Sequence, residues 1–115
     1  MTLLDRSAAL HPVCLLDRLV PERGVAALVD DVPVAVFRLV SGEVAAIDGV
    51  DPKTGANVLS RGIVGDADGA PTVASPLHKQ RYDLRTGLCL DDADLRVRVH
   101  DVRVIDGVVH VALER

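Results

Sequence analysis

Valine supplies 20 of the 115 residues, in short runs that are interrupted by turn-forming residues. A side chain that branches at Cβ loses rotamer freedom in a helix but packs well on a pleated sheet, so this enrichment favours strands. No stretch of ten or more residues carries the apolar period of an α-helix. We therefore predict an all-β chain of small antiparallel sheets, packed as a sandwich or a partly open barrel.

Turn signals divide the first half of the chain. Asp30-Asp31 and Ser41-Gly42 separate three apolar runs, at 24–30, 32–40 and 43–48. Strands joined by turns at a spacing of about ten residues are typical of an antiparallel meander. Shorter strands are expected at 13–16, 62–65, 71–75 and 81–84, with turns at 17–21, 66–69 and 85–87.

The second half predicts two long loops and a final hairpin. The loops lie at 48–62, with one helical turn at 56–60, and at 75–80. Apolar residues at 95, 97 and 99 alternate with arginines, which is the pattern of a half-buried strand. Asp106-Gly107 is the strongest hairpin signal of the chain, and 108–111 is the returning strand.

The length, charge and apolar runs of the chain limit the class of protein to which it can belong. A length of 115 residues fits one domain over 1–115, of which 1–11 are expected to form a loose N-terminal segment. Asp5 and Arg6 interrupt the apolar stretch that a signal peptide needs, and no run approaches the ~20 apolar residues of a membrane span. A net charge of −4 and 2% aromatic residues offer neither the positive surface nor the stacking side chains that nucleic-acid binding needs. We expect a cytoplasmic protein without a membrane or nucleic-acid partner.

Histidines and cysteines are few and scattered. The histidines are His11, His78, His100 and His110. His100 and His110 lie in or beside the C-terminal strands and are expected to face solvent, whereas His78 lies in a loop. Cys14 and Cys89 stand alone in apolar strands, where a free cysteine behaves as a small buried hydrophobe. Two cysteines are too few for a four-thiolate metal site.

Two loops carry residues that resemble a known domain. The first contains Asp51-Pro52-Lys53, and the second contains Ser75-Pro76-Leu77-His78. They resemble the ligand loops Cys-Pro-His and Cys-Pro-x-His of the Rieske ferredoxin domain, which hold a [2Fe–2S] cluster. The resemblance implies a Rieske-like fold with both loops at the former cluster-binding tip. Asp51, Lys53 and Ser75 then replace three ligands, and His78 alone is retained. Because an ammonium cannot ligate iron and a hydroxyl replaces a thiolate poorly, no cluster is expected.

A longer stretch narrows the resemblance. Residues 51–66, which include Asn57-Val58-Leu59-Ser60-Arg61-Gly62-Ile63-Val64-Gly65-Asp66, resemble the small-subunit family of NADH-dependent assimilatory nitrite reductases. Residues 34–38, 74–80 and 85–92 fit the same family, so that the resemblance covers roughly 12–113. The departures are Lys53, where aromatic residues are more usual, and a general scarcity of aromatic side chains.

This resemblance implies an accessory subunit of a cytoplasmic enzyme that reduces nitrite to ammonium in nitrate assimilation. FAD, sirohaem and an iron–sulfur cluster are implied on the large catalytic subunit, which would be the partner of this chain. No catalytic, cofactor-binding or metal-ligating residue is implied here. Loops 51–62 and 75–80 are expected to meet the partner, and the candidate contacts are Asp51, Lys53, Arg61, His78, Lys79 and Arg81.

Two alternatives stay open at this point. The chain could be a Rieske-type [2Fe–2S] electron carrier, which would be brown and contain about two irons per chain. It could also be a free-standing β-module that binds another oxidoreductase, which would form no stable complex with a sirohaem subunit.

Overall fold

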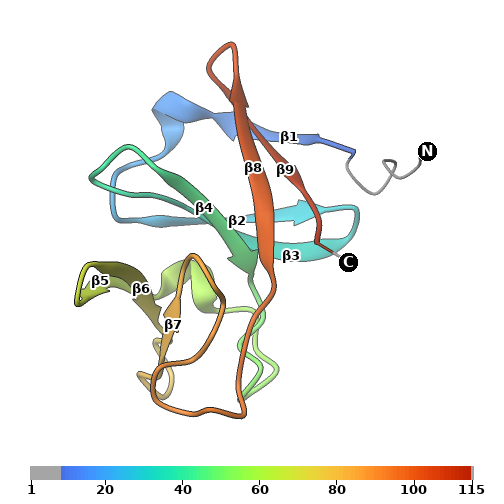
Figure 1. The fold of residues 1–115 in the computed structure, drawn as a ribbon. Helices are drawn as coiled ribbons and strands as arrows, with labels where there is room; N and C mark the ends of the chain where they lie inside the picture. The colour runs from blue at the N-terminus through green and yellow to red at the C-terminus, as the bar shows by residue number, and fades with distance from the viewer. Residues whose placement is uncertain (1–8, 115) are drawn as a thin grey trace.

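The structure, a computed structural model, describes residues 9–114 and is built almost entirely from strands (Figure 1). The loose segment expected at 1–11 lies largely outside the described residues, and His11 already begins the first strand. The elements are β1 (His11–Leu15), η2 (Leu16–Arg18), β2 (Gly24–Val29), β3 (Val32–Arg38), β4 (Val44–Asp48), η3 (Leu59–Arg61), β5 (Ile63–Ala67), β6 (Ala70–Ala74), β7 (Arg81–Asp83), β8 (Val99–Ile105) and β9 (Val108–Ala112). The all-β prediction is confirmed.

The strands form two antiparallel sheets. Six strands follow the order β1-β9-β8-β4-β3-β2, and contacts between β1 and β2 at its two ends curl this sheet toward a closed barrel. The second sheet has the order β5-β6-β7. It lies below the barrel in Figure 1, beside the two long loops. The expected partly open barrel of small antiparallel sheets is therefore present.

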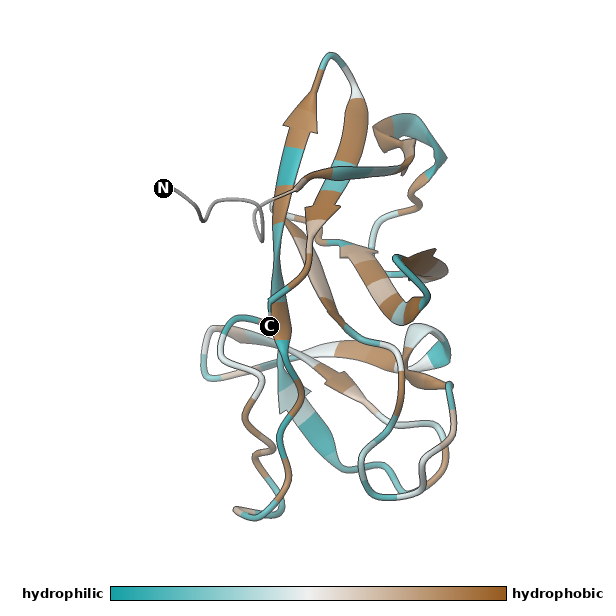
Figure 2. Cartoon of the chain, turned by 90° about the vertical axis from the view of Figure 1, so that its right-hand side faces the viewer, coloured by the Kyte–Doolittle hydropathy of each residue, from teal (hydrophilic) through white to brown (hydrophobic). Residues whose placement is uncertain are grey.

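Strand β3 separates two hydrophobic cores. Successive side chains of a strand point to opposite faces, so Ala35 and Phe37 face one core while Val34 and Val36 face the other. The first core lies toward the three-stranded sheet and contains Leu59, and the second fills the barrel. Figure 2 shows most strands largely brown and many connecting turns teal, so the apolar residues that form the cores are concentrated in the strands.

Three tight hairpin turns follow their sequence signals. Asp30-Asp31, Asp68-Gly69 and Asp106-Gly107 each have positive φ at both positions, which is the two-residue turn that matches the twist of the flanking strands. The second is shorter than the turn expected at 66–69, because β5 extends to Ala67.

Other element boundaries also differ from those expected from the sequence. The helical turn expected at 56–60 is the short helix η3, and the strand expected from 95 begins only at Val99. The alternation of 95–99 is nevertheless visible in burial, since Val97 is buried between exposed arginines. No continuous ladder of strand pairing holds that segment. It is held by isolated backbone hydrogen bonds, such as the one from the Val97 amide to the Gly87 carbonyl.

His100 was expected to face solvent, and this prediction is wrong. The residue is 3% exposed, and its ring is bonded on both sides. Nδ1 accepts a hydrogen bond from the amide of Glu114 at 2.9 Å, which leaves Nε2 to donate to Asp48 Oδ1 at 3.0 Å. Asp48 is 52 residues away in the sequence, so the local sequence pattern could not reveal this partner.

Within residues 9–114, no helix is long and apolar enough to cross a membrane.

Candidate functional site

The two loops with Rieske-like spacing meet in space. Residues 49–58 connect β4 to η3, residues 75–80 connect β6 to β7, and both lie at the lower end of Figure 1. The shortest direct link between them is a hydrogen bond from the Ser75 hydroxyl to Asp51 Oδ2, with 2.6 Å between the oxygens, and Gln80 Nε2 bonds the same carboxylate. We call these two loops the tip.

Asp51 is the centre of a buried polar cluster inside the tip. Its side chain is fully buried and accepts hydrogen bonds from the Lys53 amide, the Ser75 hydroxyl, the Gln80 amide group and the Tyr82 hydroxyl, at 2.6 to 3.3 Å. Gln80 Nε2 also donates to the Tyr82 oxygen at 3.0 Å. Four donor groups around one carboxylate are what an ionised acid needs when it is removed from water.

The protonation state of Asp51 follows from this cluster. Burial opposes ionisation, but the hydrogen bonds from Ser75, the Lys53 amide, Gln80 and Tyr82 outweigh it, so the pKa of Asp51 lies below its usual value. Burial dominates at Tyr82 and raises the pKa of its hydroxyl to about 12. At neutral pH the cluster therefore contains a carboxylate and a neutral phenol.

Backbone bonds hold the second loop in one shape. The Lys79 amide donates to the Ser75 carbonyl and the Ser75 amide donates to the Gln80 carbonyl, both at 2.9 Å. Lys79 has φ of 67°, in the left-handed region that residues other than glycine rarely adopt. Its exposed side chain thus projects from a constrained position.

The predicted contact residues divide into four groups. Lys53, His78 and Lys79 are exposed on the tip, as expected of contact residues. Arg81 is exposed beside the tip, and its guanidinium is held by Asp91 at 2.9 Å. Asp51 is buried, so its carboxylate does not lie on the surface that a partner would meet. Arg61 is exposed, but it ends η3 near Gly24 and does not lie on the tip.

Gln80 and Tyr82 are site residues that were missed as members of this cluster. Both are buried, and both lie in a stretch where inward residues alternate with the exposed Arg81 and Arg85. That period of two was the available signal, because a glutamine in such a pattern must find a buried partner. The side-chain nitrogen of Gln80 faces the Asp51 carboxylate, because only the nitrogen of an amide can donate a hydrogen bond to it.

The donor set does not fit a Rieske cluster. Such a cluster needs two thiolates on one iron and two imidazoles on the other. Both oxygens of Asp51 are occupied by hydrogen bonds, and the Ser75 hydroxyl donates its hydrogen bond to that carboxylate. Lys53 offers an ammonium, which has no lone pair. Among residues 9–114, no three His, Cys, Asp or Glu side chains are grouped as a metal site would require.

Comparison with known proteins decides the family. The model of the Rieske-like [2Fe-2S] domain matches residues 9–112. The nitrite reductase (NADH) small subunit of Escherichia coli strain K12 is 45% identical over 100 residues, which cover 86% of this chain and 93% of that protein. The chain belongs to the nitrite reductase small-subunit family. The family resemblance predicted from the tip loops and the stretch 51–66 is thereby confirmed.

Two further relatives extend this result. A crystal structure from Mycobacterium tuberculosis, described as an NADH-dependent nitrite reductase small subunit, has a TM-score of 0.89 at 46% identity, covering 93% of this chain and 96% of that one. The nitrite reductase [NAD(P)H] large subunit of Klebsiella oxytoca contains a segment 42% identical over 99 residues, which is 86% of this chain and 10% of that protein. A member of the small-subunit family is thus part of a large-subunit polypeptide in that organism.

Proposed function

We propose that this chain is an accessory subunit that docks on the large catalytic subunit of a cytoplasmic, NADH-dependent nitrite reductase, and that it has no redox centre of its own. The observation that carries the proposal is the buried carboxylate of Asp51, bonded to Ser75 where the Rieske frame would have two thiolates. In the tip, a hydrogen-bonded cluster of polar side chains stands where the Rieske frame would have metal ligands.

The large subunit is the proposed partner because of the relatives. Proteins of closely similar length and 45% identity are named as small subunits, a name that implies a larger partner. In Klebsiella oxytoca the homologous segment belongs to the large-subunit polypeptide itself. Covalent fusion holds two domains at high effective concentration, which is useful only if they work together.

The chemistry of nitrite reduction would then belong entirely to the partner. FAD, sirohaem and an iron–sulfur cluster are proposed on the large subunit, and they would carry electrons from NADH to nitrite. This chain contributes no thiolate pair to the tip, since Cys14 lies in β1 and Cys89 follows β7. Its contribution would be to bind the large subunit and support its assembly or activity.

The tip is the proposed docking surface. Lys53, His78 and Lys79 are exposed there, and Leu77, with 49% of its surface exposed, adds an apolar contact among them. The Asp51 cluster and the backbone bonds of the second loop keep this surface in one shape before binding, which lowers the entropy cost of association. Among residues 9–114, neither Lys53 nor Lys79 forms an ion pair, and their free positive charges favour an acidic surface on the partner.

Co-expression of this chain with a large subunit, followed by affinity purification and a nitrite-dependent NADH oxidation assay, tests the proposal. We expect the two chains to purify together and the activity or the yield of active enzyme to fall when this chain is omitted. An unchanged activity together with no complex would contradict the accessory role and favour a free-standing β-module.

Iron analysis of the purified chain tests the second half of the proposal. We expect a colourless protein without iron. A brown protein with about two irons per chain would instead identify a Rieske-type electron carrier.

A further inference from the structure

We propose that strand β5 takes up an extended segment of the large subunit as an additional strand of the three-stranded sheet. This inference rests on the proposed function for the identity of the partner. It concerns a different surface from the tip, and it assigns a role to the exposed residues of the stretch 61–66.

The sheet order leaves one side of β5 unpaired. In the order β5-β6-β7, β5 is an outer strand, and within residues 9–114 no other strand pairs with it. Its register with β6 is continuous from Ile63–Ala74 to Ala67–Ala70, next to the two-residue turn. Backbone groups of an antiparallel strand point alternately toward its two neighbours, starting with the pair that closes the turn.

This alternation identifies the groups that point outward. Ala67 and Gly65 direct their N–H and C=O groups toward β6, so Val64 and Asp66 direct theirs away from it. The same phase holds across the sheet, because the Pro71 carbonyl opposite Asp66 points away from β5 and accepts the Leu84 amide at 2.9 Å. Val64 and Asp66 therefore offer two donors and two acceptors to a further strand.

β5 also lacks most of the features that usually protect an outer strand. Such strands are blunted by charged side chains, lysine above all, or by proline, a bulge or a covering element, and Asp66 is the one charged residue of β5. β5 contains no lysine or proline, its register has no bulge, and the Ile63 side chain is 70% exposed. By contrast, β2 at the end of the six-stranded sheet is flanked by β1 and η3.

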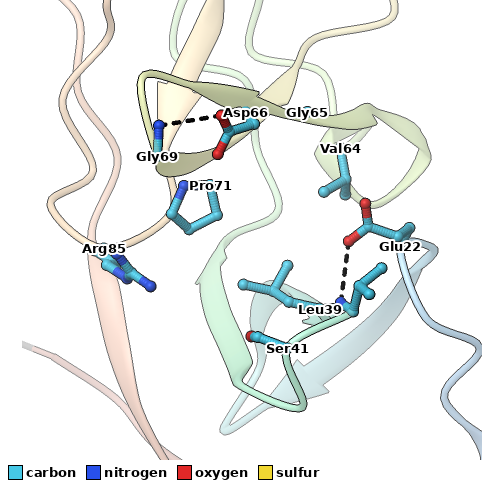
Figure 3. Close-up of a pocket in the computed structure, with 10 residues that line it drawn as sticks. Glu22, Leu39, Ser41, Val64, Gly65, Asp66, Gly69, Pro71 and Arg85 are labelled. Carbon is cyan, nitrogen blue, oxygen red and sulfur yellow. Dashed lines mark hydrogen bonds between the residues drawn. The ribbon is translucent and has the colours of Figure 1, made fainter.

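The surroundings of β5 indicate what kind of segment would fit. A cleft of about 310 Å³ lies between the β5–β6 hairpin and the turn after β3. Figure 3 shows Val64, Asp66 and Glu22 among the residues that line it. No ion pair among the described residues neutralises Glu22 or Asp66, while Arg85, the cation of the cleft, is already paired with Glu43 at 2.9 Å. The segment would place an apolar side chain beside Val64 and a basic one near the two carboxylates.

The same charges argue against a second copy of this chain as the occupant. Pairing of two β5 strands about a two-fold axis at Gly65 would bring the Asp66 and Glu22 carboxylates of one copy toward those of the other. Like charges at such an interface are unfavourable. A basic segment of the large subunit meets no such repulsion.

Hydrogen exchange of single amides tests strand addition directly. In the free chain, the amides of Gly65 and Ala67 should be protected by β6, and those of Val64 and Asp66 should exchange fast. In the complex with the large subunit, we expect the exchange of Val64 and Asp66 to slow by at least about tenfold, with no loss of protection at the two control positions.

A matched pair of variants tests the same surface by affinity. Ile63→Lys places a cation on the β5 edge, and Leu28→Lys makes the same kind of change on β2 at a side chain that is also 70% exposed. We expect Ile63→Lys to raise the Kd for the large subunit at least about tenfold and Leu28→Lys to change it less than about twofold.

The outcomes separate this inference from the proposed function. If the complex forms but Val64 and Asp66 exchange as fast as in the free chain, strand addition is wrong and the docking proposal stands. If the free chain is a dimer with these amides protected, a second copy is the occupant and the inference is overturned. If the wild-type chain does not bind the large subunit, both proposals fail.

Discussion

The Ser75 hydroxyl donates a hydrogen bond of 2.6 Å to Asp51 Oδ2 and joins the two loops of the tip across 24 residues of sequence. These are the two positions where the Rieske frame would place thiolates. A metal cluster would bind both loops covalently, and here a charge-assisted hydrogen bond inside a buried cluster joins them instead. The shape of the tip therefore depends on this buried polar cluster together with the backbone hydrogen bonds within the loops.

Removing the hydroxyl should destabilise the chain. Ser75→Ala deletes a buried hydrogen bond to a charged acceptor, so we expect the free energy of unfolding to fall by about 1.5–3 kcal/mol. Urea denaturation followed by circular dichroism measures this change. Ser41→Ala is the matched control, because Ser41 is exposed and accepts only the Glu43 amide, and it should cost less than about 0.5 kcal/mol. Equal losses in both variants would show that the Asp51 cluster contributes nothing special.

Asp48 should make the stability depend on pH in the acid range. Burial opposes its ionisation, but hydrogen bonds from His100 and Arg98 outweigh burial and lower its pKa from 3.8 to about 2. A lowered pKa stabilises the fold above the unfolded value, and this stabilisation is lost as the pH falls from about 4 to about 2. Its size at neutral pH is about 2 kcal/mol.

The variant Asp48→Asn tests this dependence. We expect it to unfold more easily than the wild type at pH 7, with a difference that shrinks toward pH 2. Asp101→Asn is the control, since Asp101 is exposed and its ion pair with Arg103 is long, with 3.9 Å between Asp101 Oδ2 and Arg103 Nε. Denaturant unfolding at several pH values provides the comparison, and a pH-independent difference for Asp48→Asn would contradict the assignment.

Much of the fold was predictable because it is local. Asp106-Gly107 identifies its hairpin within four residues, and the valine-rich runs identify the strands beside it. The proximity of the tip loops was also predicted, from the spacing of Asp51 and Ser75 within a known pattern. What the spacing did not reveal was that Asp51 turns inward and loses its access to a partner.

The remaining features depend on pairs that are distant in sequence. His100 is buried because Asp48 and the Glu114 amide satisfy both ring nitrogens, and neither partner is visible in the alternation around His100. Gln80 is likewise buried because Asp51, 29 residues earlier, accepts its amide protons. A pattern of apolar residues locates strands, but it does not state which buried polar group will meet which.

Restoring the missing ligands tests whether the Rieske frame persists. The triple variant Asp51→Cys, Lys53→His and Ser75→Cys supplies, with the native His78, the two thiolates and two imidazoles of a Rieske centre. After reconstitution we expect about two irons per chain and the absorption of a [2Fe–2S] cluster, because the loops keep the required spacing. A double variant with Lys53 retained is the control. A folded triple variant that takes up no iron would show that the tip has lost the geometry of a cluster site.

The central claim is that the tip of this chain docks on the large subunit. It is tested most directly by the Kd of the wild type and of Lys53→Glu/Lys79→Glu for the purified large subunit, measured by isothermal titration. Arg18→Glu/Arg103→Glu is the control, because these arginines are exposed on η2 and β8, away from the tip (Figure 1). We predict a Kd at least about tenfold weaker for the tip variant and nearly unchanged for the control. Equal affinities for the tip variant and the wild type would contradict the account.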